Sequence, residues 1–425
     1  MRKLWIWLAI PLILVIAAGA WYVFMEHAES PIRVGILHSR TGRMAMSESS
    51  MIDAEVLALE EINARGGLLG RKVEWVIADG GSDWPRFARE ARRLIETENV
   101  SVVFGCWTSA SRKSVKPVFE EKNHLLVYPM AYEGIERSPN IVYTGAAPNQ
   151  QIIPTVKWCY DHLKARRFFL VGSDYVWPRC VGAIARDQIK GLGAEVVSDR
   201  YVFFDSSSVD GIIDEIKTKK PDVVLSSLVG ETNVAFYTRL AAAGVWPATI
   251  PIVSFSIAEE ELRKLPAASM AGDYAAWTYF QSIERDDANS FARRFQARYG
   301  ADRVVSSTMA SAYDGVMLWS KAVEEADSAE VSRVRRFIVR QSMGAHGGVT
   351  AIDEETQHAW LPVYIGKIRN DGQFDVVWSS SKPVRPVPYP ISRSRSEWEE
   401  FLGSLYRGWG GSWSNPVETK AEPAG

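Results

Sequence analysis

The chain has 425 residues, of which 47% are hydrophobic and 24% are charged, a composition typical of a folded globular protein. This length exceeds what a single hydrophobic core ordinarily serves, so at least two domains are expected. Because 49 Lys and Arg nearly balance 51 Asp and Glu, the chain lacks the excess of positive charge that a nucleic-acid partner requires.

The N-terminal segment, residues 1–30, contains an uncharged run from Leu4 to Met25 that is long enough to span a bilayer as a helix. Arg2 and Lys3 precede this run, which favours a cytoplasmic N-terminus and an extracytoplasmic location for the remaining chain. A cleaved signal peptide is the alternative, because Ala18-Gly19-Ala20 resembles a cleavage site. The apolar run continues beyond that site, which favours an uncleaved anchor in the cytoplasmic membrane.

From Arg33 onward, short strand-like runs alternate with segments of helical periodicity, as in parallel sheets flanked by helices. In this first part, Asp83 is the expected N-cap of a helix with Pro85 in its first turn. The predicted strands are 33–37, 73–78, 100–104 and 125–128, and the predicted helices lie around 54–62, 83–95 and 115–122.

The same alternation resumes after the polar stretch Pro148 to Gln151. Strands are predicted at 168–171, 196–203 and 223–228. One helix is predicted to run through residue 163, and another to span about 181–190. The chain therefore predicts two consecutive three-layer units, each with its own parallel sheet.

Near the C-terminus, Asn370-Asp371-Gly372 separates two strand-like runs, Val363 to Ile368 and Phe374 to Trp378, which predicts an antiparallel hairpin. Beyond Ser379 the sequence is rich in Ser, Arg, Pro and Gly. The stretch from Ser412 to the end is expected to be disordered.

Sequence signatures of catalysis are missing. The chain has no HEXXH, paired CXXC, GXSXG or Walker motif, and its six histidines show no metal-ligand spacing. Three cysteines, Cys106, Cys159 and Cys180, are too few for a disulfide framework and are interpreted as core residues, with a Cys159–Cys180 bridge left open. A protein that is not an enzyme and needs no cofactor or metal is therefore expected.

Polar and aromatic residues gather instead where predicted strands end, the edge at which open α/β sheets bind ligands. Four junctions stand out: His38 to Gly42, Gly105 to Ser109, Tyr128 to Gly134, and Gly172 to Arg179. Aromatic walls with a few hydrogen-bonding groups favour a small, neutral, polar ligand. The competing interpretation is that Trp107, Tyr128 and Trp177 only pack between lobes and that Ser109 caps a helix.

Several runs, in order along the chain, carry a family resemblance: Gly35 to Gly42, Val103 to Lys113, Ala147 to Gln151, Phe169 to Tyr175, and Ala275 to Ser282. They resemble the urea-binding proteins of ABC importers and, in part, the related short-chain amide-binding proteins. The resemblance covers roughly residues 32–390. It implies a type I periplasmic binding protein, an α/β fold of two three-layer, parallel-sheet lobes that are joined by three crossover segments and close by a hinge.

With crossovers near Pro148, Gln281 and Ser342, the resemblance implies the following division: lobe one 31–148 and 281–340, lobe two 149–280 and 341–382, and a tail 383–425. The implied function is an extracytoplasmic solute-binding protein that delivers urea or a short-chain amide to the permease and ATPase subunits of an ABC importer. The alternative is a membrane-tethered sensor of amides or branched-chain amino acids that acts through a partner protein.

The implied ligand-binding residues lie at the four junctions. They are Ser39, Trp107, Thr108, Ser109, Tyr128, Pro129, Tyr132 and Glu133 on lobe one, and Tyr175 and Trp177 on lobe two. Urea carries four N–H donors and one carbonyl acceptor, so Ser109 and Glu133 are expected to accept hydrogen bonds from it.

Two positions leave alternatives open. Glu133 is alternatively a structural carboxylate paired with Arg137 or Arg112. Ala131 stands where the urea-binding pattern has a glutamine, which leaves space for an amide larger than urea.

Overall fold

The computed structural model describes residues 30–203 and 207–416. The expected membrane anchor, Leu4 to Met25, lies outside the described residues, as do the last residues, 417–425. Within the described ranges, no helix combines the length and the apolar character that crossing a membrane requires.

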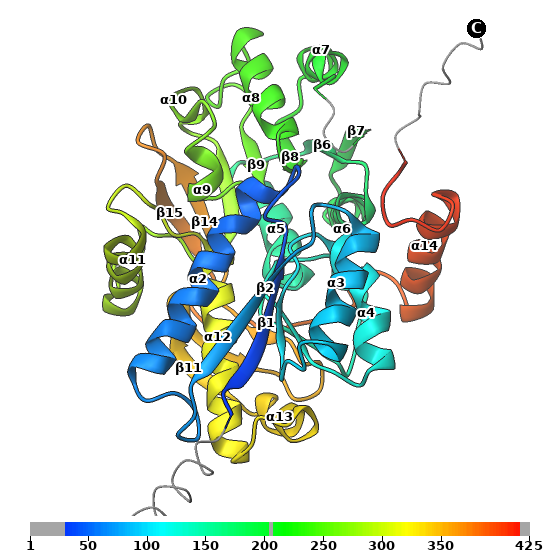
Figure 1. The fold of residues 1–425 in the computed structure, drawn as a ribbon. Helices are drawn as coiled ribbons and strands as arrows, with labels where there is room; N and C mark the ends of the chain where they lie inside the picture. The colour runs from blue at the N-terminus through cyan, green and yellow to red at the C-terminus, as the bar shows by residue number, and fades with distance from the viewer. Residues whose placement is uncertain (1–29, 204–206, 417–425) are drawn as a thin grey trace, which may run out of the picture.

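The first of two large sheets has five parallel strands in the order β2-β1-β3-β4-β5 (lower half of Figure 1). Helices α2 and α12 pack together on one face of it, and α3 and α4 on the other. The strands are β1 (Ile32–His38), β2 (Val73–Asp79), β3 (Val103–Gly105), β4 (Leu126–Tyr128) and β5 (Ile141–Tyr143). The helices are α2 (Ala45–Ala64), α3 (Trp84–Glu96), α4 (Ser109–Glu121), α11 (Asp286–Tyr299), α12 (Ser307–Ala326) and α13 (Val331–Ile338).

The second sheet has seven strands in the order β15-β14-β10-β9-β8-β6-β7 (upper half of Figure 1). Its strands are β6 (Arg167–Ser173), β7 (Glu195–Val202), β8 (Val223–Ser227), β9 (Ile252–Ser254), β10 (Tyr274–Trp277), β14 (Tyr364–Ile368) and β15 (Phe374–Ser379). Its helices are α5 (Ile152–His162), α6 (Val176–Gly191), α7 (Asp210–Lys219), α8 (Thr232–Ala242), α9 (Glu259–Leu262) and α10 (Ala267–Met270).

Three passages of the chain connect the two sheets. The first follows β5 through the short 3₁₀ helix η1 (Pro148–Gln150), and the second follows β10 toward α11 and α12. The third runs through a small antiparallel sheet of β11 (Ser342–Ala345), β12 (Gly348–Ile352) and β13 (Ala359–Trp360) before reaching β14. The parallel-sheet α/β architecture predicted from the sequence is thus confirmed. We use "lobe one" for the five-stranded sheet with its helices and "lobe two" for the seven-stranded sheet with its helices.

Local sequence signals account for several boundaries. The Asp83 side chain accepts a hydrogen bond from the Arg86 amide at 2.6 Å and caps α3, as predicted. The predicted hairpin is also present, since β14 and β15 pair antiparallel and Gly372 adopts a φ of 77° in the turn. Strand β5, three residues long, was not predicted from the sequence.

The core lies between each sheet and its helices. In the first sheet, the fully buried Trp319 of α12 meets Phe104 of β3 edge to face, with ring centroids 5.7 Å apart. The three cysteines are buried and free, so the possible Cys159–Cys180 bridge is absent from the described part of the chain.

The tail contains ordered structure, and the disorder expected from Ser412 onward is not found in residues 412–416, the part of that stretch that the structure describes. Ser394 caps helix α14 (Arg395–Gly408), and the fully buried Trp398 donates its indole hydrogen to the Pro390 carbonyl at 2.8 Å. Residues 412–416 are hydrogen-bonded to the segment between β6 and α6. Buried aromatic residues such as Trp398 therefore stabilise a segment that is otherwise rich in Ser, Arg and Gly.

Candidate functional site

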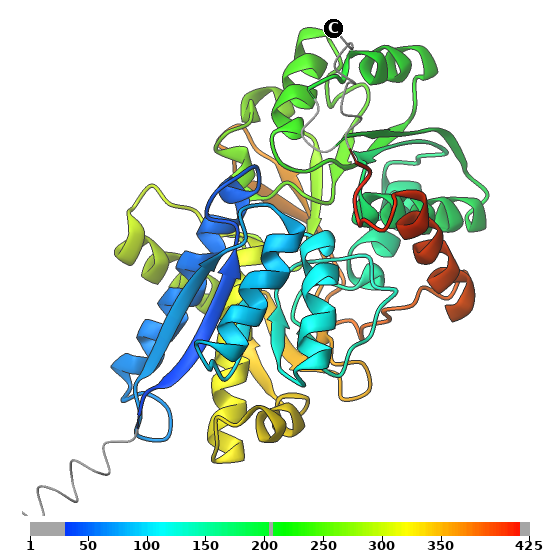
Figure 2. The same ribbon diagram turned by 45° about the vertical axis from the view of Figure 1, so that its right-hand side comes forward.

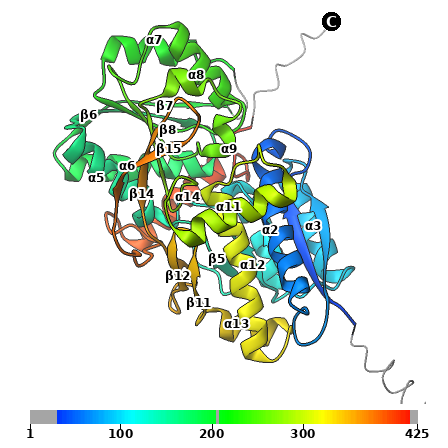
Figure 3. The same cartoon turned by 90° about the vertical axis from the view of Figure 1, so that its left-hand side faces the viewer.

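The carboxyl ends of the strands in the two lobes meet in the middle of the molecule. The Ser47 hydroxyl on α2 donates to Glu261 on α9 at 2.9 Å, which joins the lobes where α9 adjoins the start of α2 (Figure 3). Nearby, burial raises the pKa of Tyr175 well above its usual value, and the proximity of Tyr128 and Glu133 raises it further. The junctions predicted on opposite lobes are therefore close to one another.

Arg112 on α4 organises the ends of β3 and β4. Its guanidinium donates to Glu133 at 2.8 Å, to Glu136 at 2.9 Å and to Ser109 at 3.1 Å, and it is completely buried. Ser109 in turn donates to the second oxygen of Glu133. Of the two partners considered for Glu133, the structure selects Arg112, which lies one helical turn from Ser109 on the same face of α4.

Aromatic rings enclose this charged network. The Arg112 guanidinium lies over the rings of Tyr132 and Tyr128, at 4.4 Å and 4.8 Å from their centroids. Tyr132 stacks on Tyr143 and Tyr143 on His358, with centroid distances of 5.0 Å and 4.2 Å. Burial lowers the pKa of His358 to about 3, so this imidazole is neutral.

The remaining lobe-one candidates are engaged locally. Thr108, and not Ser109, caps α4, because its hydroxyl accepts from the Ser111 amide at 3.0 Å. The Tyr128 hydroxyl donates to the Trp107 carbonyl at 2.9 Å, and Trp107 is 3% exposed. Pro129 is buried beside them.

Ser39 belongs to a second buried charge cluster at the end of β1. Its hydroxyl accepts from the Ser82 amide at 3.0 Å, and its own amide donates to Glu48 at 2.6 Å. His38 lies 3.0 Å from Glu55 and 3.5 Å from Glu48. Burial opposes a charge on His38, but the two carboxylates outweigh it and raise its pKa to about 10.

On lobe two, Tyr175 and Trp177 follow β6 as predicted. Both are buried, and their ring centroids are 6.3 Å apart. The indole nitrogen of Trp177 is buried without a hydrogen-bond partner among the described residues. Such a donor is costly to leave unpaired, so it marks a place where a ligand acceptor is expected.

Four further residues with buried, unpartnered polar atoms lie along the same edge of the second sheet. They are Thr232 and Asn233 after β8, Glu259 after β9 and Tyr279 after β10. Strands β6, β8, β9 and β10 are parallel to one another, so their carboxyl ends share this edge. Ligands bind at the carboxyl ends of parallel strands, so the predicted strand 223–228 points to Thr232 and Asn233. The family resemblance did not include these two residues.

Glu259 is neutral at pH 7 in this environment. It is 0% exposed, and burial raises its pKa to about 8, while the Gln281 amide donates to its other oxygen at 2.7 Å. A protonated carboxyl group offers a ligand both a donor and an acceptor.

The raised pKa of Glu259 predicts that the stability of the folded protein depends on pH. Between its unfolded pKa and about 8, Glu259 holds its proton more tightly in the folded state, so stability falls as pH rises through that range. Glu259→Gln is expected to be more stable than the parent protein by a few kcal/mol at pH 8.5 and equally stable at pH 4, measured by unfolding in guanidinium chloride. The exposed Glu231→Gln serves as control and should change stability by no more than about 0.5 kcal/mol at either pH. Equal stability of Glu259→Gln and the parent at both pH values would contradict the shift.

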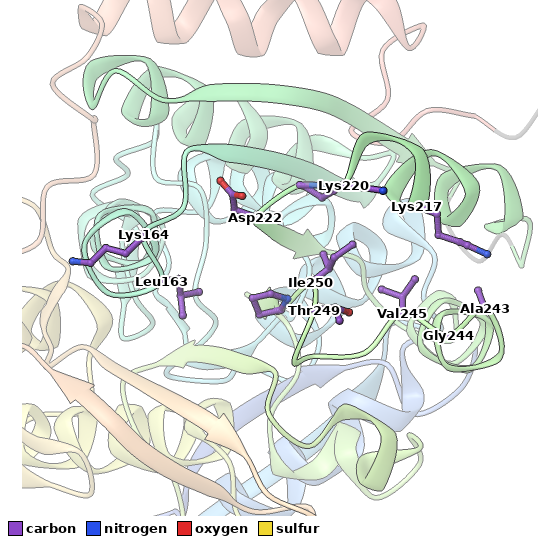
Figure 4. A pocket seen from close by; sticks show the side chains of 12 residues that line it. Leu163, Lys164, Lys217, Lys220, Asp222, Ala243, Gly244, Val245, Thr249 and Ile250 are labelled. Carbon is purple, nitrogen blue, oxygen red and sulfur yellow. The ribbon is translucent and has the colours of Figure 1, made fainter.

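A separate pocket of about 650 Å³ lies away from these residues (Figure 4). It is lined by segments that precede β6, β8 and β9, including Leu163, Asp222 and Ile250. The amino ends of these strands form the edge opposite to the candidate site, and none of the predicted ligand-binding residues lines this pocket.

Solved structures share the fold. LivJ, a branched-chain amino acid transporter substrate-binding protein from Streptococcus pneumoniae in complex with isoleucine, matches with a TM-score of 0.73 at 19% identity, covering 84% of this chain and 100% of that chain. A solute-binding protein of an ABC transporter from R. palustris in complex with benzoate matches with a TM-score of 0.75 at 19% identity, covering 84% of this chain and 98% of that one.

Curated relatives match over shorter stretches. A protein described as limonene hydroxylase from Geobacillus stearothermophilus is 33% identical over 118 residues, 28% of this chain and 22% of that protein. A Leu/Ile/Val-binding protein of Rhizobium johnstonii is 26% identical over 205 residues, 47% of this chain and 55% of that protein. The chain thus spans only about a quarter to a half of the length of these relatives.

Residues 32–395, nearly the whole described chain, match the family described as periplasmic binding protein domain. The S. pneumoniae and R. palustris proteins are described as binding proteins of transporters and not as enzymes, in agreement with the missing catalytic signatures. The fold, the strand-end site and this match together show that the chain belongs to the periplasmic binding protein family, with the type I fold.

Proposed function

We propose that the protein is the solute-binding component of an ABC importer and captures urea or a short-chain amide between the strand ends of its two lobes. The observation that carries this proposal is the division of polar groups at the site. The charged side chains pair with one another, whereas the groups left without partners are uncharged at pH 7. The transport role is supported by the S. pneumoniae and R. palustris proteins, which are described as transporter components.

The pairing of charges disfavours a carboxylate ligand. Isoleucine and benzoate each carry a carboxylate, which needs a cation or several donors when it is buried. Arg112 already donates to Glu133, Glu136 and Ser109, and Lys113 lies 3.0 Å from Glu136. Each cation pairs with both Glu133 and Glu136, so recruiting either one for a ligand would weaken the neutralisation of two buried carboxylates.

The unpartnered groups match the hydrogen-bonding pattern of an amide. Asn233 and Thr232 offer oxygen acceptors for N–H groups, and Trp177 offers a donor for a carbonyl oxygen. Protonated Glu259 supplies one more of each. An amide also lacks the charge whose desolvation would weaken binding in a buried site.

A branched-chain amino acid is the second candidate, because relatives named for such ligands cover about half of this chain. An ammonium group would require Glu259 to lose its proton, so isoleucine affinity should increase as pH rises toward 8. Amide affinity should instead decrease over the same range, because Glu259 then ceases to donate.

We also propose that the run from Leu4 to Met25 tethers the protein to the cytoplasmic membrane. Its uncharged length and the preceding Arg2 and Lys3 support a tether. Retention in the membrane fraction after a carbonate wash is expected, and complete release would contradict the tether.

Calorimetric titration of the purified protein at pH 6.5 tests the ligand. Urea, acetamide or formamide is expected to bind, whereas isoleucine and benzoate are expected to produce no binding heat. Trp177→Phe, which removes only the indole donor, should weaken amide binding about tenfold, equivalent to about 1.4 kcal/mol. Trp246→Phe, at a tryptophan that is 46% exposed, serves as the matched control and should bind as the parent does. Binding of isoleucine with no response to any amide would refute the amide proposal.

A further inference from the structure

The end of the described chain returns to the candidate site. After α14, residues 409–416 run back toward α6 on lobe two and toward α3 and α4 on lobe one (red segment in Figure 2). This segment of otherwise simple composition carries two tryptophans, Trp409 and Trp413.

The segment is firmly fixed to lobe two. The Asn415 amide donates to the Asp174 carbonyl at 3.0 Å, and its side chain donates to the Asp174 carboxylate at 2.7 Å. The Val176 amide donates to the Trp413 carbonyl at 3.0 Å. Further back, Arg393 pairs with Asp187 of α6 at 2.7 Å and holds the start of α14 in place.

The contacts that the described residues of the segment make with lobe one involve side chains. The Trp84 indole at the start of α3 donates to the Ser414 hydroxyl at 3.3 Å. The Lys113 ammonium of α4 lies 5.0 Å from the centroid of the Trp413 ring. Single contacts of this type are weak enough to break and re-form during a hinge motion.

The position of the segment links it to the ligand. Ser414 forms an antiparallel bridge with Tyr175, one of the predicted ligand-binding residues, and the pairing ends two residues before Trp177. The segment therefore lies against the part of lobe two that faces Tyr128 and Glu133 of lobe one.

We propose that residues 412–416 form a latch that belongs to lobe two and holds lobe one in the closed position, so that it sets how long a ligand is retained. This inference rests on the proposed function. When the lobes separate, the latch stays with Asp174 and Val176 and leaves Trp84 and Lys113. Loss of the two side-chain contacts favours the open state.

The closed population is measured without any ligand. Spin labels at Lys72→Cys on lobe one and Lys217→Cys on lobe two, both exposed positions, report the distance between the lobes, while the three native cysteines are buried. The double variant Trp413→Ala/Ser414→Ala is expected to shift the distribution to longer distances. Trp409→Ala, which removes a tryptophan of the same segment, should leave it unchanged. An unchanged distribution in the double variant overturns the latch.

Ligand retention is measured separately by stopped-flow dissociation of urea or acetamide. The double variant is expected to release ligand about tenfold faster than the parent, with Trp409→Ala unchanged. Faster release by the control variant to the same extent would overturn the latch, because it would indicate a general loss of order in the tail.

A mutant cycle tests the central contact. Trp84→Phe and Ser414→Ala should each lengthen the lobe-to-lobe distance, and their combination should add nothing, because both remove one hydrogen bond. Full additivity would contradict the contact. Failure of every amide to bind would refute the proposed function. The latch would still be tested by the spin-label distances, because these are measured without ligand.

Discussion

Replacing Arg112 with leucine is expected to destabilise the protein by about 3–5 kcal/mol or to prevent folding. The substitution leaves Glu133 and Glu136 buried without their principal cation. Burial opposes ionisation of Glu136, but Arg112, with Lys113, holds its pKa well below the usual range, so this carboxylate is charged in the parent protein. The cost is therefore that of an uncompensated charge rather than of one lost hydrogen bond.

Unfolding in guanidinium chloride measures this effect, since urea is a proposed ligand. Arg137→Leu is the matched control, because Arg137 lies next to Glu136 in sequence but is exposed, and its loss should cost no more than about 1 kcal/mol. If the two variants proved equally stable, the buried network would not have the role assigned to it.

Replacing His38 with glutamine is expected to have a comparable effect that depends on pH. The pKa of His38 is raised to about 10, so the stabilisation it gives is complete below about pH 6.5 and is lost as pH rises toward 10. At pH 6 the variant leaves Glu48 and Glu55 without a cation and should be less stable by about 3–5 kcal/mol. Near pH 10 the difference from the parent should shrink.

The exposed His162→Gln provides the control and should change stability by less than about 1 kcal/mol at both pH values. A constant difference between His38→Gln and the parent from pH 6 to pH 10 would show that His38 is not charged in the folded protein.

Sequence patterns were sufficient for most of the architecture because helices such as α3 have one buried face and the central strands, such as β8, are continuous buried runs. The strand predicted at 33–37 is β1, and the hairpin around Asn370 to Gly372 is the pair β14–β15. Strand β3 is shorter than predicted and begins at Val103, since the buried residues before it lie in the approach to the sheet. An apolar run in the sequence does not show which of its residues belong to the strand and which to the buried segment before it.

The candidate site was predicted less completely, because side-chain pairing is decided by tertiary structure. From the sequence, Glu133 had two equally reasonable partners, Arg112 and Arg137. The fold places Arg112 beneath the strand ends and leaves Arg137 at the surface. Likewise, nothing in the local sequence around Trp413 indicates that it meets Lys113, 300 positions earlier in the chain.

The free cysteines have a consequence for where the protein can fold. Burial raises the pKa values of Cys106, Cys159 and Cys180, so each thiol is held in its unreactive, protonated form. Because its three cysteines form no disulfide, the protein needs no oxidoreductase in order to fold, and its fold does not depend on the redox state of its surroundings. The same fold is therefore accessible in the reducing cytoplasm of an expression host.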